Sequence, residues 1–148
     1  MGRIGRASLP DGFFHVVARG VFGAAIYADD HDRRWFLDLL RRCESNHSWT
    51  CHAFCLMTTH YHLVLETTRV QLSHGLHWLN TCHATTFNRR HGRFGHLFAE
   101  RFSASAIESE DYLYDVCSYV LLNPVKARLC DRAEDWPWSF SRFGIEPS

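Results

Sequence analysis

Apolar runs with β-branched and aromatic residues predict four β-strands. The first spans Phe13–Arg19 and is closed by Gly20. The second, Trp49–Met57, and the third, His60–Glu66, are separated only by Thr58 and Thr59, which predicts a hairpin. A fourth strand is expected within Phe94–Ile107.

Alternation along the second strand assigns its residues to two faces of the sheet. One face is predicted to carry Cys51, Ala53, Cys55 and Met57, and the other His52, Phe54 and Leu56.

Apolar residues at helical spacing predict three helices. The first covers Arg33–Cys43, with an N-cap among Asp29–Asp32, and the second covers Leu72–Asn88. The third begins at Tyr112, after the acidic stretch Glu108–Asp111. It should end or kink at Asn123, because Pro124 lacks an N–H donor and disfavours helical conformation in the residue before it.

The order of these elements predicts an α+β fold. It fits a ferredoxin-like antiparallel sheet with helices on one face, extended by a C-terminal helix and tail. Met1 to Gly12 is predicted to be an irregular arm, and the aromatic tail from Trp136 is expected to pack back onto the sheet. We expect residues 1–148 to form a single domain.

The sequence His60-Tyr61-His62 at the start of the third strand is a candidate metal site. Side chains at i and i+2 share one face of a strand, roughly 6 to 7 Å apart at their Cα atoms. The apolar side chains of Tyr61, Leu63 and Leu65 would fill the opposite face. Two imidazoles can hold a divalent cation only if the fold supplies a further ligand, and a strand histidine is more often a packed or surface residue.

Composition narrows the function classes. The chain has 16 Lys and Arg against 16 Asp and Glu, so its net charge does not indicate a nucleic-acid partner. Basic residues are nevertheless concentrated locally, which indicates DNA-phosphate contacts or a solvated face. The candidate DNA-binding residues are Arg89, Arg90, Arg93, Arg101 and Lys126.

The cysteines and the hydropathy pattern indicate compartment. None of the six cysteines forms a CxxC pair, no signal peptide is evident, and no apolar run approaches the ~20 residues of a membrane span. We therefore expect reduced thiols, a cytoplasmic protein and no membrane contact.

The third predicted helix carries a second set of candidates. Tyr119 and Asn123 lie at i and i+4 and therefore share a helical face. If that face lies over the histidines, Asn123 can offer a carboxamide oxygen to a cation, and Tyr119 can attack a phosphodiester. Tyr112 and Tyr114 are alternative nucleophiles. Glu66 shares the histidine face and is either a water-mediated ligand or a strand end, and His15, His52 and His96 are interpreted as core or surface residues.

Several motifs in order resemble one protein family. They are His15-Val16-Val17-Ala18-Arg19-Gly20, Asp32-Arg33-Arg34-Trp35-Phe36-Leu37, Cys55-Leu56-Met57-Thr58-Thr59-His60-Tyr61-His62-Leu63, Gly95-His96-Leu97-Phe98-Ala99-Glu100-Arg101-Phe102, Tyr119-Val120-Leu121-Leu122-Asn123-Pro124-Val125-Lys126-Ala127 and Trp138-Ser139. Across nearly the whole chain, this pattern resembles the REP-associated tyrosine transposases of the HUH superfamily of single-strand DNA transposases.

The resemblance implies a mechanism and a substrate. His60, His62 and Asn123 would hold Mg²⁺ or Mn²⁺, and Tyr119 would form a 5′-phosphotyrosine link that frees a 3′-OH. The substrate would be single-stranded DNA with an imperfect hairpin, cleaved and rejoined by a monomer or a homodimer. Two alternatives stay open: a domesticated protein that binds DNA hairpins without cleaving them, and a metal-dependent phosphodiesterase that uses an activated water.

Overall fold

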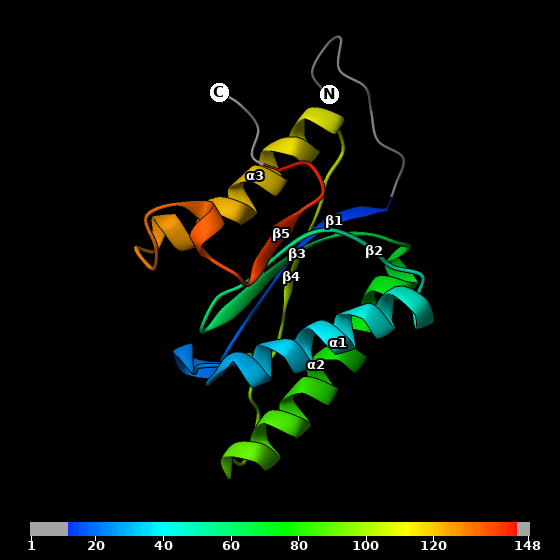
Figure 1. Cartoon of the computed structure of the whole chain (residues 1–148). Helices are drawn as coiled ribbons and strands as arrows, with labels where there is room; N and C mark the ends of the chain where they lie inside the picture. The colour runs from blue at the N-terminus through cyan, green and yellow to red at the C-terminus, as the bar shows by residue number, and fades with distance from the viewer. Residues whose placement is uncertain (1–11, 145–148) are drawn as a thin grey trace.

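Five antiparallel strands form one twisted sheet in the computed structural model, which describes residues 12–144 (Figure 1). Their spatial order is β4-β1-β3-β2-β5. The strands are β1 (Phe13–Arg19), β2 (Thr50–Leu56), β3 (His60–Glu66), β4 (Ser103–Ala106) and β5 (Ser139–Ser141). Apart from Gly12, the predicted N-terminal arm lies outside the described residues.

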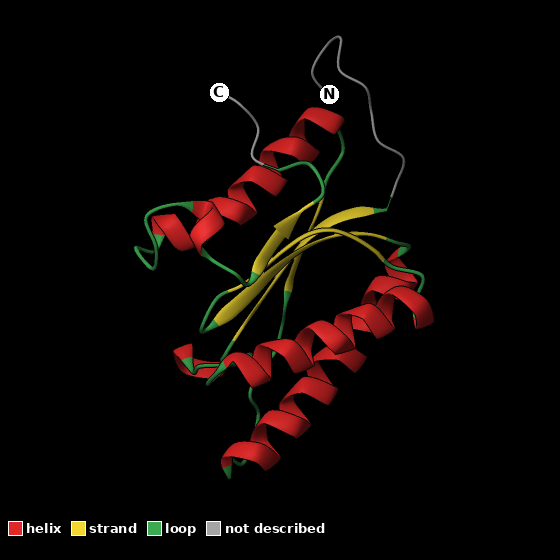
Figure 2. Ribbon diagram, in the orientation of Figure 1, coloured by secondary structure: helices red, strands yellow, loops and turns green. Residues whose placement is uncertain are grey.

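Helices cover both faces of this sheet (Figure 2). α1 (Asp30–Asn46) and α2 (Arg69–His91) pack on one face, and α3 (Glu110–Lys126) packs on the other. The short 3₁₀ helices η1 (Val21–Gly23) and η2 (Ala133–Asp135) lie in connecting segments. The ferredoxin-like arrangement is therefore confirmed, and the additional C-terminal helix lies on the face opposite its two main helices.

A polar side chain begins each long helix, because the first N–H groups of a helix have no partner within it. Asp29 accepts a hydrogen bond from the N–H of Asp32 at 3.0 Å, which starts α1 three residues earlier than predicted. Thr68 and Ser109 accept from the third residue after each of them and start α2 and α3 in the same way. None of the helices between residues 12 and 144 is long and apolar enough to span a membrane.

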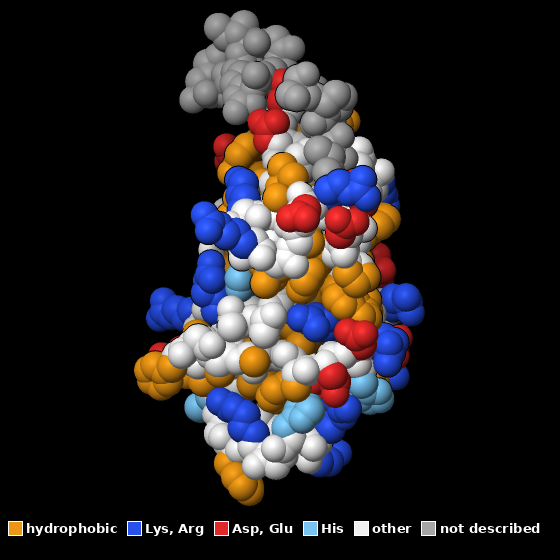
Figure 3. Space-filling view, turned by 60° about the vertical axis from the view of Figure 1, so that its left-hand side comes forward, with side chains coloured by type: hydrophobic (Ala, Val, Ile, Leu, Met, Phe, Trp, Pro, Cys, Tyr) orange, Lys and Arg blue, Asp and Glu red, His pale blue; other side chains and the backbone are white. Residues whose placement is uncertain are grey.

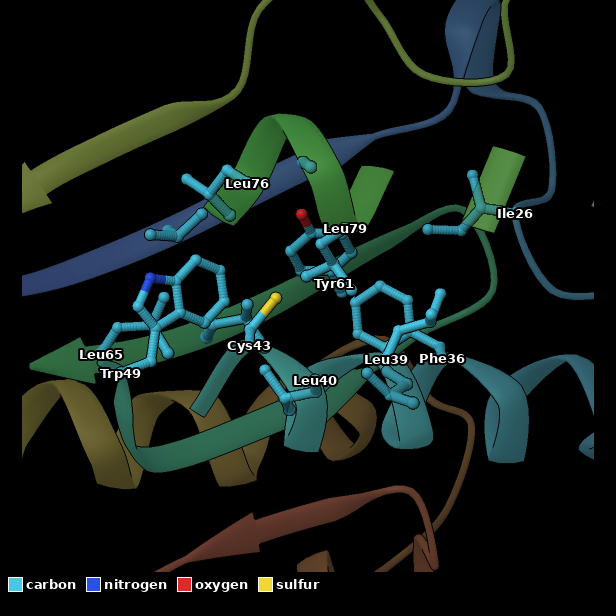
Figure 4. Packing of buried hydrophobic residues seen from close by; sticks show 14 of the residues in the cluster. Ile26, Phe36, Leu39, Leu40, Cys43, Trp49, Tyr61, Leu65, Leu76 and Leu79 are labelled. Atoms are coloured by element: carbon cyan, nitrogen blue, oxygen red, sulfur yellow. The ribbon is translucent and has the colours of Figure 1, made fainter. Parts of the chain in front are cut away.

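The larger hydrophobic core lies between the sheet and the pair α1 and α2. Tyr61 and Leu65 of β3 point into it together with Phe36 and Leu39 of α1 and Leu76 of α2 (Figure 4). The Tyr61 hydroxyl, which would otherwise be an unpaired buried donor, donates to Oδ1 of Asn80 at 2.6 Å. The prediction that Tyr61, Leu63 and Leu65 fill the face opposite the histidines is confirmed.

A β-bulge in β2 corrects one predicted detail. The register between β2 and β3 shifts between Cys51 and Ala53. An extra residue reverses the alternation locally, so Cys51 packs against the core under α1 and α2, whereas His52 stacks on Phe13 and Phe143 on the α3 face. The face assignment is correct from Ala53 onward and wrong for Cys51 and His52.

The predicted fourth strand is mostly an irregular segment. Only Ser103–Ala106 pairs with β1 as a strand, and Phe98 makes a single bridge to Gly20. The phenylalanines of this segment recur every four residues rather than every two, and Gly95 has a positive φ of 87°. Neither feature suits an extended strand.

The C-terminal part of the chain departs from the prediction in two ways. α3 continues through Pro124 to Lys126, because the N–H groups of Ala127 and Leu129 still reach the carbonyls of Asn123 and Pro124 at 2.9 Å. The tail does pack back onto the sheet as predicted, but it also adds β5 beside β2, which the pattern of aromatic residues did not indicate.

We predict that Gly75→Ala destabilises the protein, although alanine is the better helix former by about 1 kcal/mol. A Cβ at Gly75 would lie 2.4 Å from Cζ2 of Trp49. This overlap should lower the free energy of unfolding by about 1–3 kcal/mol in urea denaturation. His74→Ala, at an exposed position on the same helix, is the control and should change little. A Gly75→Ala protein more stable than the wild type would contradict this packing.

Candidate active site

His60 and His62 lie side by side on the face of β3 that α3 covers, as predicted. Their ring centroids are 5.2 Å apart. The β1–β3 ladder pairs His62 with Val17 and His60 with Arg19. The two imidazoles therefore stand at the end of the sheet where β1 finishes and β3 begins.

His62 is held as a neutral base with one nitrogen unpaired. Its Nδ1 lies 3.0 Å from Nε2 of His15 on β1, and the two rings stack. Its Nε2 is buried and has no hydrogen-bond partner among the described residues. Burial, and then the charges of His15, His60 and Arg19, lower the pKa of His62 to about 3. A buried, neutral and unpartnered imidazole nitrogen is suited to coordinating a cation.

His60 is less buried and has a similar arrangement. Its Nδ1 lies 3.2 Å from the Thr59 hydroxyl, so its Nε2 remains for another partner. Burial and the neighbouring positive charge of Arg19 lower the pKa of His60 below its ordinary value. Both imidazoles can thus present a neutral Nε2.

Tyr119 of α3 lies directly over this histidine cluster. Its ring centroid is 5.9 Å from that of His62 and 6.1 Å from that of His15, edge-on in both cases. The side chain is 41% exposed, so a large substrate can reach its hydroxyl. Nζ of Lys126 lies 4.8 Å from the centre of the same ring, on the next-but-one turn of the helix.

The alternative tyrosines are less well situated. Tyr114 packs its ring against Phe143 at 4.8 Å, and Tyr112 lies two turns before Tyr119 at the N-terminal end of α3. Tyr119, in contrast, places its ring against those of His15 and His62.

Asn123 lies one turn beyond Tyr119 and can complete a donor set. Its Nδ2 donates to the backbone carbonyl of Tyr119 at 3.1 Å, which leaves the carboxamide oxygen for a ligand. Residues 12–144 contain no cluster of three or more His, Cys, Asp or Glu side chains suited to a metal, and Asn123 offers an amide oxygen instead. Two imidazole nitrogens and an amide oxygen suit Mn²⁺ and can also serve Mg²⁺.

Glu66 and the other histidines lie where the sequence predicted, with the exception of His15. Glu66 lies at the far end of β3, where it bonds Nε2 of His52 at 3.0 Å, so it is a strand end and not a neighbour of His60. His52 is a buried residue and His96 an exposed one, as predicted. His15 was interpreted as a core or surface residue, but it belongs to the candidate site. The register of β1 on β3, which the sequence does not reveal, brings it there.

Some of the candidate DNA-binding residues make contacts within the protein, and others are exposed. Arg90 forms ion pairs with Asp29 and Asp32, each at 2.7 Å, and so links the end of α2 to the start of α1. Arg93 donates to the carbonyls of Gly95 and His96 and shapes its own loop. Arg89 and Arg101 are exposed, and Lys126 lies beside Tyr119.

An open groove of about 900 Å³ runs between α2 and the segment Gly95–Phe102. Its walls include His77, Asn80, Thr81 and Glu100, and none of the residues around Tyr119 lines it. The candidate active site lies instead on the other face of the sheet, where the exposed Tyr119 ring lies over the buried His62.

Comparison with known proteins agrees with this geometry. The model of the IS200-like transposase family matches residues 13–123, which include both histidines, Tyr119 and Asn123. The chain belongs to this family. It is 22% identical over 138 aligned positions to a Haemophilus influenzae protein named "Putative REP-associated tyrosine transposase", covering 81% of this chain and 78% of that protein.

A solved structure has the same fold. It is that of a REP-associated tyrosine transposase bound to a REP hairpin, with a TM-score of 0.67 and 14% sequence identity. The match covers 94% of this chain and 82% of the other.

We predict that Asp32→Asn destabilises the protein at neutral pH but not in acid. Burial alone would raise the pKa of Asp32, but hydrogen bonds from the N–H of Ala28, from Arg90 and from His91 hold it below its ordinary value. The stability contributed by this carboxylate is therefore present above about pH 4 and is lost as pH falls further. Urea midpoints should differ at pH 7 and converge toward pH 3.

Asp38→Asn is the control for this experiment, because the contact of Asp38 with Arg41 is exposed. A difference between wild type and Asp32→Asn that is constant from pH 7 to pH 3 would show that the charge of Asp32 contributes nothing.

Proposed function

We propose that this transposase-family protein cleaves and rejoins hairpin-bearing single-stranded DNA through a 5′-phosphotyrosine on Tyr119. The observation that carries the proposal is the contact of the exposed Tyr119 ring with His62, whose buried Nε2 has no partner. A nucleophile and an unsatisfied ligand atom thus lie together beside open solvent.

The strand-transfer step follows from these side chains. The Tyr119 phenolate attacks the scissile phosphorus, forms an Oη–P bond and displaces the 3′ oxygen of the preceding nucleotide, which leaves as a 3′-OH after protonation. The phosphotyrosine link retains the energy of the original phosphodiester, so a 3′-OH can reverse the reaction and join strands without ATP.

His60, His62 and Asn123 are the residues that would hold the divalent cation. Bound there, Mg²⁺ or Mn²⁺ would act as a Lewis acid on the scissile phosphate. His15 would fix the His62 tautomer: with Nδ1–H donated to Nε2 of His15, the lone pair of His62 Nε2 faces the cation.

A DNA hairpin is the proposed partner because a structural relative is bound to a REP hairpin. The exposure of Tyr119 is consistent with a polymer substrate, which can reach a side chain at the protein surface. A single-stranded segment beside the hairpin would allow the phosphate to reach the Tyr119 hydroxyl without unwinding a duplex.

We predict that Tyr119→Phe abolishes covalent attachment to DNA. Wild-type protein incubated with Mn²⁺ and single-stranded DNA that contains host repeat hairpins should yield an adduct that survives a denaturing gel. Tyr119→Phe and His60→Ala should yield none, because one lacks the nucleophile and the other lacks a ligand. Tyr112→Phe is the matched control and should form the adduct normally.

The same gels separate the alternatives. Cleavage without an adduct, retained in Tyr119→Phe and lost in His60→Ala, would indicate a phosphodiesterase that activates water. Hairpin binding without cleavage or adduct in any protein would indicate a binding module.

We predict that His15→Phe weakens Mn²⁺ binding about tenfold or more in calorimetry without DNA. Phenylalanine can keep the ring stacking on His62 but cannot accept its Nδ1–H, so the orientation and basicity of the ligand are lost. His96→Phe, at an exposed position outside the site, is the control. Unchanged Mn²⁺ affinity in His15→Phe would show that His15 does not act through His62.

A further inference from the structure

The segment after β1 presents a phenylalanine that folding alone does not explain. Phe22 is fully exposed and adopts φ 51° and ψ 33°, the left-handed region that a bulky residue rarely occupies. Such a conformation is strained and persists only when the surrounding structure enforces it. Neither the exposure of the ring nor the backbone strain stabilises the fold.

Backbone hydrogen bonds fix this segment to the start of β3. The N–H of Gly20 donates to Thr59 and that of Ile26 to Thr58, at 2.8 and 2.9 Å, and the N–H of Val21 donates to Leu97 at 2.8 Å. Thr58 and Thr59 form the turn that leads directly into His60. Phe22 is therefore an exposed ring on a loop whose backbone is hydrogen-bonded to the turn that precedes His60.

Arg19 ends β1 three residues before Phe22. It is the β1 partner of His60 and shares the α3 face of the sheet with His15, two alternations earlier on the same strand. The Arg19 side chain is exposed. On the side of the molecule that Figure 3 brings forward, Lys and Arg side chains are interspersed with hydrophobic ones and with Asp and Glu.

We infer that Arg19 and Phe22 bind the single-stranded DNA segment next to the scissile phosphate, Arg19 through a phosphate and Phe22 by stacking on a base. An exposed aromatic ring beside a cation is the arrangement that holds single strands without sequence preference, since every base has a π-face. A stiff, strained loop suits this task because it loses little entropy on binding. The inference rests on the proposed function for the course of the strand.

Binding is measured without cleavage, in the Tyr119→Phe protein, by fluorescence anisotropy with a labelled oligothymidylate that forms no hairpin. Phe22→Ala should raise the Kd about fivefold or more, the effect of removing one stacked base, and Phe22→Trp should restore tight binding. Arg19→Gln should raise the Kd and reduce its dependence on salt concentration by about one phosphate contact.

Two matched controls accompany these variants. Phe140→Ala removes an exposed ring on β5, an edge strand separated from β1 by β3 and β2. Arg34→Gln removes an exposed charge on α1. Both should leave the Kd unchanged. Urea denaturation of each variant should show that the fold is intact, and Phe22→Ala should be as stable as the parent or more so.

The outcomes separate this inference from the proposed function. Equal Kd values for Phe22→Ala, Phe140→Ala and the parent would overturn the role of Phe22, even if the wild-type protein forms the Tyr119 adduct. A wild-type protein that forms no adduct, but whose oligothymidylate binding depends on Phe22 and Arg19, would overturn the cleavage chemistry and keep the binding surface.

Discussion

The antiparallel pairing of β1 with β3 is the constraint on which the candidate site depends. Seven residue pairs, from Phe13 with Glu66 to Arg19 with His60, fix the register of these central strands. This register brings His15 within 3.0 Å of His62 and sets Arg19 beside His60. A slip of one residue would turn every side chain of one strand to the other face. The apolar side chains of that strand would then leave the core under α1 and α2, so core packing and the geometry of the site select the same register.

One face of the sheet forms the larger hydrophobic core, and the other holds the candidate site. Under α1 and α2, the buried side chains of Tyr61, Leu63 and Leu65 anchor β3 in a large core. The histidines belong to the same strand, so this packing also fixes the position of their backbone. On the other face, α3 packs through Val116, Cys117 and Val120, beside Trp136 and Phe143 of the C-terminal segment. Tyr119 lies over the histidines and is still 41% exposed.

The spacing of residues within single strands and helices predicted much of this arrangement. The β2–β3 hairpin, the shared face of His60 and His62, and the i, i+4 relation of Tyr119 and Asn123 all follow from fixed periodicities of strands and helices. Contacts between distant segments could not be predicted in this way. His15 was missed because its place in the site depends on the register of another strand. The pairing of Arg90 with Asp29 and Asp32 was not predicted, because these residues lie about 60 positions away in the sequence. The bulge in β2 left no signal in the pattern of apolar residues.

The central claim is that Tyr119 becomes covalently attached to a 5′ phosphate of DNA. Mass spectrometry of protease-digested adduct, formed by the wild-type protein in Mn²⁺, tests this most directly. The peptide that contains Tyr119 should carry the mass of the 5′-terminal nucleotides, with fragmentation assigning the phosphate to the Tyr119 ring oxygen. An adduct mapped to Tyr112, to Tyr114 or to any other residue would contradict the account.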